Sequence, residues 1–408
     1  MTRTLTVRIK RILAFIHLWL GLILFIPLIV LGLTGSILVF GDELNRALGT
    51  APPRATAAGP AKPVSEIIAA ARTGAPAGAI PVGVRMPEDT GEPATVRFAV
   101  RRDPSQPAPQ GPPGIAGTVP VHVDAASLQV LGTGPMLGAE GQGFMRLMHN
   151  LHGNLMIQGR TGREVVGWFG VVMLFLGVSG MVMWWPKRGQ WKRGFTVRWG
   201  ASAQTFNRDL HGATGIWLWL VFIIISFSGT YLVFPQTMSA PMVAMFGRVT
   251  PQVPDVTIPA PVPGQQRVSV DVAVEAARKA AGGDVTLRSL QLPGRNDQPF
   301  RVILDQPGAS HGTPTINAFV DALSGQVLEM RDPRRFNAAE TFMAWQRPLH
   351  YGEGLGWIWK LLTFVSGLLP LLFVITGFTL WLNKRRNRRA AAERAAAAIA
   401  ASKSLPVQ

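Results

Sequence analysis

The chain has 408 residues and contains no cysteine. Without thiolates it cannot hold an iron–sulfur cluster, a covalently attached c-type haem, a cysteine-ligated metal or a disulfide. Histidine is scarce as well, with seven residues in the whole sequence. No serine-nucleophile, paired-carboxylate or phosphate-loop motif is present, so the sequence does not indicate hydrolysis or phosphoryl transfer. Any site that uses nitrogen ligands must draw on a handful of positions.

Charged residues are almost absent from the cores of four long apolar runs. These runs cover roughly residues 12–40, 164–185, 214–234 and 357–382. Each reaches the about 20 residues that a helix needs to cross a hydrocarbon core of about 30 Å. The first run is longer than the apolar core of a signal peptide, and no A-x-A site follows closely, so we expect it to stay as an anchor. The sequence therefore predicts a membrane protein with four spans.

Lysine and arginine gather at the N-terminus, in the loop "PKRGQWKRGFTVR" (186–198) and in the tail "NKRRNRR" (383–389). The long connections 41–145 and 235–345 mix acids and bases. The positive-inside rule therefore predicts that both termini and the short loop are cytoplasmic and that both long connections lie outside. The net charge of +17 follows from this placement and suits an anionic lipid surface. No basic patch with interleaved aromatic residues indicates a nucleic-acid partner.

Three pairs of similar segments recur in one order along the chain. "GLTGSILVF" (32–40) resembles "SFSGTYLVF" (226–234), and these segments are 194 residues apart. "VDAASLQVL" (123–131) resembles "VDALSGQVL" (320–328), and "VSGMVMWWPKR" (178–188) resembles "ITGFTLWLNKR" (375–385), each at a separation of 197 residues. The sequence therefore predicts an internal duplication of a unit made of a span, an outer domain and a second span. Because each unit has two spans, the copies should be related by an axis along the membrane normal.

Each outer domain has the pattern of a small α+β unit. Helical spacing of apolar residues marks "PVSEIIAAARTG" and "SVDVAVEAARKAAGG". Strand-like segments follow them, "ATVRFAVRR" and "GTVPVHVD" in the first copy and "PFRVILDQ" and "TINAFVD" in the second, before a turn and a last short strand. The Pro/Gly/Ala-rich stretches 49–62, 104–119 and 251–265 are expected to be loops or linkers.

The predicted order of segments is span 12–40, outer domain 41–145, span with an outer extension 146–185, cytoplasmic loop 186–207, span 208–234, outer domain 235–341, span with an outer extension 342–382, and basic cytoplasmic tail 383–408.

The repeat sorts four histidines into two pairs of equivalent positions. Gly35 and Gly229 occupy equivalent positions in the repeat. His17 precedes Gly35 by 18 residues and His211 precedes Gly229 by 18 residues, so the two histidines are equivalent, at the cytoplasmic starts of the first and third spans. His152 and His350 occupy equivalent positions at the outer starts of the second and fourth spans. The sequence therefore predicts one histidine pair near each face of the membrane.

Two imidazoles that face each other from neighbouring helices suit the two axial positions of a haem iron. Ionisable residues within spans are candidates for function. We therefore expect His17 with His211, and His152 with His350, to ligate haem b, in two bis-histidine sites. A zinc site is less suitable because no carboxylate partner recurs. Copper remains an alternative, with His149 and the thioethers of Met145, Met148 and Met156 as ligands.

Several residues near these histidines are further candidates. Arg208, Arg347 and Arg163 are expected to bind haem propionates, although a positive-inside or snorkelling role would also explain them. His149 has no counterpart in the repeat, and its role stays open. His122 and His311 are expected to be surface histidines of the outer domains.

Five motifs in the sequence resemble, in their order, the PepSY-associated transmembrane family of bacterial inner-membrane proteins. They are "HLWLG", "LHGNLMIQGRTGREVVGWFGV", "SGMVMWWPKR", "NRDLHGATG" and "LHYGEGLG". The "VDAxSxQVL" segments resemble the last strand of PepSY modules. The resemblance implies a four-helix transmembrane bundle with two α+β PepSY-like periplasmic domains.

Members of that family include ferric-siderophore reductases that hold b-type haems between four helices. The resemblance thus implies a multi-pass cytochrome of the bacterial inner membrane, with a ferric siderophore as substrate and a quinol or a cytoplasmic reductant as electron donor. The implied haem ligands are His17, His211, His152 and His350. Two alternatives stay open: a non-catalytic PepSY protein that binds peptides or partners, and a copper-handling membrane protein.

Overall fold

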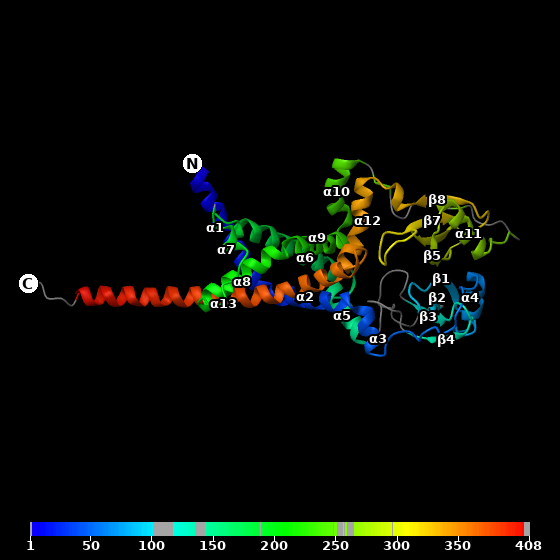
Figure 1. Cartoon of the computed structure of the whole chain (residues 1–408), viewed down its shortest axis with the longest axis horizontal. Coiled ribbons are helices and arrows are strands. Elements are labelled where there is room, and N and C mark those ends of the chain that lie inside the picture. Colours follow the sequence, from blue (N-terminus) through cyan, green and yellow to red (C-terminus); the bar gives the residue numbers. More distant parts are fainter. Residues whose placement is uncertain are drawn as a thin grey trace, which may run out of the picture. The chain divides into compact units, whose positions relative to one another are not determined.

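The computed structural model describes residues 2–100, 117–134, 143–187, 189–247, 249–250, 256, 258, 265–295 and 297–403. The chain forms two compact units (Figure 1). The helical unit comprises Met1–Val39, Asn150–Pro235 and Ile358–Gln408, and the sheet unit comprises Phe40–His149 and Gln236–Trp357. The predicted loops 104–119 and 251–265 fall largely outside the described residues, as do residues 404–408 of the predicted tail.

The helical unit contains the apolar helices. Its elements are α1 (Thr2–Ile23), α2 (Phe25–Val39), α6 (Gly159–Trp184), α7 (Trp191–Gly194), α8 (Ala203–Trp217), α9 (Trp219–Val233) and α13 (Gly356–Lys403). Helices α6 and α13 are each long and apolar enough to cross a membrane. The pairs α1–α2 and α8–α9 meet the same criteria only as bent spans, with bends of 71° and 65°. The described residues therefore contain two helices that are long and apolar enough to cross a membrane, or four such spans if each bent pair is one span.

The two bends occur at matching positions. They lie at Leu24 and Leu218, which are 194 residues apart, the separation already found between the first pair of similar segments. Pro27 accounts for the first bend, because it lacks an N–H and its ring clashes with the carbonyl of the residue four positions earlier. The second bend has no proline; there the Thr214 hydroxyl donates to the Leu210 carbonyl at 2.6 Å, a bond that favours helix bending.

Each bent pair packs against α6 and α13. Helices α1 and α2 both contact α6, and α2 also packs on α13, where Gly32 and Ser36 lie against Gly367 and the Ser36 hydroxyl donates to the Phe364 carbonyl at 2.7 Å. Helices α8 and α9 both contact α6 as well, and Gly170 of α6 lies against Thr230 of α9. Small residues let the backbones of membrane helices approach closely.

The sheet unit contains one eight-stranded antiparallel sheet in the order β4-β3-β2-β1-β5-β6-β7-β8 (Figure 1). The strands are β1 (Ile80–Arg85), β2 (Ala94–Ala99), β3 (Thr118–Val123), β4 (Val130–Thr133), β5 (Thr286–Gln291), β6 (Phe300–Asp305), β7 (Ile316–Val320) and β8 (Val327–Arg331). The helices are α3 (Gly41–Ala47), α4 (Val64–Arg72), α5 (Gly143–Asn154), α10 (Pro235–Phe246), α11 (Val270–Ala281), η1 (Pro333–Arg335) and α12 (Ala338–Tyr351). Helix α5 ends in the helical unit.

The element order of the sheet unit repeats, with one helix followed by four strands in each half. The predicted helices correspond to α4 and α11, and the predicted strands to β2, β3, β6 and β7, so these predictions are confirmed. The structure adds β1 and β5, which join the halves through the pairs Gly83–Gln291, Val84–Leu290 and Arg85–Ser289. One hydrophobic core runs through both halves. The two predicted outer domains therefore fold as one sheet with one core.

The junction between β1 and β5 predicts the effect of a core substitution. Leu290 of β5 is 1% exposed, so Leu290→Ala should lower the free energy of unfolding of the sheet unit by about 2–5 kcal/mol. Denaturant unfolding of the full-length protein in detergent would measure this change. Val272→Ala on α11, where the side chain is 50% exposed, is the matched control. Equal stability of the two variants would contradict a shared core at this junction.

Candidate functional site

His17 lies on α1 and faces α6. Its Nδ1 is 2.8 Å from the hydroxyl oxygen of Ser179, which is 2% exposed. The next residue of α6 is Gly180, and a Cβ there would lie 3.6 Å from Cε1 of His17. The imidazole is therefore held against a Ser–Gly dipeptide of the neighbouring helix.

His211 lies on α8 and makes the matching contacts with α13. Its Nδ1 is 2.8 Å from the hydroxyl oxygen of Thr376, which is 1% exposed. A Cβ on Gly377 would lie 3.8 Å from Cε1 of His211. The ring of Phe373 packs beside the imidazole, with ring centroids 4.8 Å apart. The two histidines that the repeat predicts to be equivalent thus have equivalent surroundings.

His17 and His211 lie in the same unit, on helices α1 and α8, and both of these helices contact α6. Their pairing as an inner site stays a prediction. Since Nδ1 of each ring is engaged with a hydroxyl, Nε2 is the atom of each ring that can bind a metal centre. Two such nitrogens from separate helices can hold a planar cofactor through its central ion.

His152 lies on α5 and packs against α2. Its Nδ1 donates to the Leu31 carbonyl at 3.0 Å and lies 3.4 Å from the Thr34 hydroxyl. A Cβ on Gly35 would lie 2.8 Å from Cε1 of His152, so only glycine fits there without displacing the imidazole. The setting is again a hydroxyl residue followed by glycine. His149 lies three residues earlier on the same helix, and its role as a ligand stays a prediction.

His350 lies near the end of α12, beside Tyr351, with ring centroids 6.2 Å apart. Helix α12 begins at a capping box formed by Asn337 and Glu340. His350 belongs to the sheet unit and His152 to the helical unit. Their pairing as an outer site therefore stays a prediction.

The three arginines expected near haem propionates have partners within the protein. Arg208 is 63% exposed and its guanidinium lies 3.4 Å from the Asp209 carboxylate. Arg163 donates to the Leu232 carbonyl at 2.6 Å, and Arg347 lies over the ring of Tyr351 at 4.9 Å from its centroid. A role of these side chains in binding propionates stays a prediction.

His122 corrects the sequence analysis. It was expected at the surface, but it is 0% exposed, and its Nδ1 lies 3.0 Å from the Thr95 hydroxyl on the adjacent strand. Side chains alternate between the faces of a strand. Because Val121 and Val123 of β3 are also buried, this end of β3 is covered on both faces, and the imidazole is enclosed.

His311 is half-exposed, as expected for a surface histidine, but it belongs to an ion cluster. The carboxylate of Glu88 receives hydrogen bonds from Arg85 at 2.7 Å and Arg288 at 2.5 Å, and His311 Nδ1 lies 2.9 Å from it. Burial raises the pKa of Glu88, but the bonds from His311 and Arg288 outweigh burial and hold that pKa below its usual range. The bond to Glu88 raises the pKa of His311 against the opposing effect of burial.

The His311 loop is also attached to the segment after α12. The Gly354 N–H donates to the His311 carbonyl at 3.0 Å, and the Ser310 hydroxyl donates to the Gly354 carbonyl at 3.1 Å. Gly354 has a φ of +81°, a conformation that favours glycine. The loop therefore contacts the ion cluster of Glu88 and Arg288, which lie in different halves of the sheet. It also contacts the segment that follows His350.

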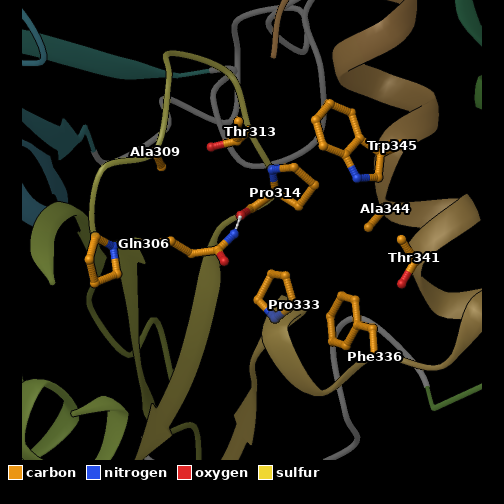
Figure 2. A pocket seen from close by; sticks show the side chains of 10 residues that line it. Gln306, Ala309, Thr313, Pro314, Pro333, Phe336, Thr341, Ala344 and Trp345 are labelled. Carbon is orange, nitrogen blue, oxygen red and sulfur yellow. Dashed lines mark hydrogen bonds between the residues drawn. The ribbon is translucent and has the colours of Figure 1, made fainter. Parts of the chain in front are cut away.

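A cavity of about 290 Å³ lies next to this loop (Figure 2). Phe336 and Trp345 flank it, and the Gln306 side-chain amide donates to the Pro314 carbonyl at 2.6 Å. The lining residues are Gln306, Pro307, Ala309, Thr313, Pro314, Pro333, Phe336, Thr341, Ala344 and Trp345. None of them is charged, so the cavity suits an uncharged, apolar group.

Across the described parts of the chain, no three histidine, aspartate or glutamate side chains are grouped so that they could hold a metal ion. Among the predicted ligands, His17 and His211 are the two with matching hydroxyl and glycine neighbours.

Sequence reasoning missed the part played by Ser179, Thr376 and Thr34. All three stand directly before a glycine in the segments that revealed the repeat. Those segments were used only to align the copies. The recurrence of a hydroxyl residue before each of these glycines was the signal that could have identified the partners of the histidines.

The ion cluster predicts a pH dependence of stability. A histidine with a raised pKa in the folded state stabilises the fold below its unfolded pKa of about 6.5, and this contribution is lost as the pH rises through the folded pKa. The carboxylate of Glu88, with a lowered pKa, stays ionised over that window. His311→Gln should therefore destabilise the protein at pH 5.5, by less than about 1 kcal/mol because the pair is partly exposed, and have little effect at pH 9.

Denaturant midpoints of the full-length protein and the variant at the two pH values would measure this difference. In a Glu88→Gln background, the additional effect of His311→Gln should no longer depend on pH. A His311→Gln effect of equal size at both pH values would contradict the prediction.

The family model described as the PepSY-associated TM region matches residues 14–384, a range that begins within α1 and ends within α13 and includes α6, the pair α8–α9 and the sheet unit. No match to a curated protein sequence was found.

Proposed function

Because the chain belongs to the PepSY-associated transmembrane family, a family of membrane proteins, we propose that it is a b-type cytochrome of a bacterial inner membrane. It carries electrons from a quinol or a cytoplasmic reductant across the membrane and reduces the iron of a ferric siderophore on the periplasmic side. The observation that carries this proposal is the His17–His211 pair, held on two different helices by matching hydroxyl–glycine contacts.

The surroundings of this pair fit a haem. Both rings keep Nδ1 engaged with a hydroxyl, so Nε2 of each is the atom that would bind the iron. Gly180 and Gly377 keep the space beside the rings free of Cβ atoms, and Phe373 supplies an aromatic wall beside His211. The haem would supply the reversible uptake of one electron at its iron. His17 and His211 would hold it, and the apolar helices would keep water away from it.

A second haem belongs to the proposal, with His152 and His350 as its ligands. His152 resembles the inner histidines, since its Nδ1–H is engaged and its ring lies against a glycine that follows a hydroxyl residue. Two haems near opposite faces would form a path for electrons across the membrane. In the proposed orientation both termini are cytoplasmic and the sheet unit is periplasmic, as the distribution of lysine and arginine favours.

The proposed reaction needs no general base or nucleophile. One electron converts Fe(III) to Fe(II), and the hard oxygen ligands of a siderophore hold Fe(II) less tightly than Fe(III). Reduction would therefore release the iron for uptake. The internal duplication is also part of the proposal; the matching bends at Leu24 and Leu218 and the two similar halves of the sheet support it.

The proposal predicts a haem spectrum. The purified full-length protein should show a haem absorbance band that sharpens and shifts when dithionite is added. His17→Ala and His211→Ala should each remove about half of the haem, because each substitution takes one axial ligand from one of the two sites. His311→Ala, in the sheet unit, is the control and should keep the full haem content. A colourless wild-type protein with no extractable haem would exclude the proposed function.

A second candidate function is the binding of a peptide or protein partner by the sheet unit. The uncharged cavity flanked by Phe336 and Trp345 favours it, because aromatic-lined pockets accept apolar side chains of partners. Ala344→Trp should fill this cavity and abolish partner binding while leaving haem content and the rate of siderophore reduction unchanged. Pull-down from cell extract and the haem spectrum of the same variant would separate the two functions.

A further inference from the structure

The hydroxyls that contact His17 and His211 each have a backbone carbonyl within hydrogen-bond distance on their own helix. The Ser179 hydroxyl donates to the Leu176 carbonyl at 3.2 Å, and the Thr376 hydroxyl donates to the Leu372 carbonyl at 2.8 Å. A hydroxyl has one hydrogen, so an oxygen that donates to a carbonyl can only accept from an imidazole. With their own protons directed to these carbonyls, the two hydroxyl oxygens are placed to accept from Nδ1–H of His17 and His211, each at 2.8 Å.

We infer that Ser179 and Thr376 are positioning residues that fix His17 and His211 in the tautomer with the proton on Nδ1 and the lone pair on Nε2. In a neutral imidazole, one nitrogen is a donor and the other an acceptor, and the partner of one nitrogen decides the state of both. The two hydroxyls thus prepare both Nε2 atoms as ligands before any cofactor binds. The extension to haem rests on the proposed function.

The two hydroxyls are arranged alike although they lie 197 residues apart. Each is at least 98% buried, so water does not compete for the bond. Each stands before a glycine whose missing side chain leaves room for the imidazole. Each also uses its own proton within its helix, toward a carbonyl three or four residues earlier. Two such coincidences at equivalent positions favour a role in positioning over incidental packing.

The chemical consequence concerns the strength of the ligand. A metal-bound histidine whose other N–H donates to a fixed acceptor is held in orientation and is a stronger base, and loss of such a partner typically lowers metal affinity by about 10- to 100-fold. A stronger base stabilises Fe(III) relative to Fe(II). Removing the hydroxyls should therefore weaken haem binding and move the midpoint potential of the inner haem upward.

His152 provides a comparison within the same chain. Its Nδ1 donates to the Leu31 carbonyl at 3.0 Å, and the Thr34 hydroxyl, at 3.4 Å, donates to the Val30 carbonyl at 2.6 Å. A backbone carbonyl can only accept, so it fixes the same tautomer without a side chain. Thr34→Val and Thr376→Val are therefore the same chemical change, each before a glycine that lies beside an imidazole, with different expected results.

The first experiment uses the haem-free full-length protein in detergent, labelled with ¹⁵N-histidine. Its seven histidines make the imidazole ¹⁵N shifts assignable by single substitutions. His17 and His211 should be found with the proton on Nδ1 at a pH where they are neutral. Ser179→Ala should shift His17, and Thr376→Val should shift His211, toward a mixture of tautomers. Thr34→Val should leave His152 unchanged.

Rescue and fold controls complete this experiment. Ser179→Thr and Thr376→Ser retain the hydroxyl and should restore the wild-type tautomer. Thr379→Val removes a hydroxyl of α13 that donates to the Ile375 carbonyl at 2.7 Å and should change neither histidine. Unchanged tautomers in Ser179→Ala and Thr376→Val would overturn the inference, whether or not the protein binds haem.

The second experiment titrates haem into the same variants. Ser179→Ala and Thr376→Val should each bind the inner haem about 10- to 100-fold more weakly and show a higher midpoint potential, while Thr379→Val keeps wild-type values. If the wild-type protein binds no haem but the tautomers respond as expected, the proposed function fails and the positioning role stands. If haem affinity and potential do not respond to the loss of either hydroxyl, the extension of the inference to haem is wrong.

Discussion

The helical unit depends on one recurring contact, in which an imidazole packs against a hydroxyl residue that is followed by glycine. The hydroxyl supplies a hydrogen-bond acceptor inside an apolar helix without a charge, and the glycine supplies the space for the ring. Ser179–Gly180 and Thr376–Gly377 both provide this arrangement, and beside Thr34–Gly35 the Leu31 carbonyl is the acceptor for His152. In a medium with no water to compete, a polar side chain without such a partner would be costly. The contact therefore makes histidine tolerable there and at the same time orients it.

The histidines of this contact lie on the first helix of each bent pair. Helix α1 presents His17 to Ser179 of α6, and beyond the 71° bend α2 packs its Gly32 and Ser36 against α13. Helix α8 presents His211 to Thr376 of α13, and beyond the 65° bend α9 packs Thr230 against Gly170 of α6. Each histidine therefore precedes the bend of its helix pair.

Much of this organisation is readable from the sequence, because apolar runs, period-two strands and repeated segments are local patterns. Helices α4 and α11, the strands beside them and the spans α6 and α13 were predicted in this way. Strands β1 and β5 were not, because "IPVGVR" contains a proline and a glycine and "TLRSLQ" is largely polar, so their local patterns do not mark strands. Both become strands by pairing with their neighbours in the sheet. The burial of His122 was missed for a similar reason, since it depends on what covers the strand and not on the strand itself.

The histidine positions were found from the repeat, but their hydroxyl partners were not, and the difference is physical. A ligand has a distinctive residue type, whereas a serine or threonine in an apolar helix normally satisfies itself by bonding to its own backbone. Ser179 and Thr376 both lie within hydrogen-bond distance of a carbonyl of their own helix. A feature that resembles ordinary helix packing in the sequence therefore acquires its meaning only when the neighbouring helix is known. In the proposed arrangement, the intrahelical bond directs the hydroxyl proton away from the histidine, and the histidine supplies the proton of the bond between them.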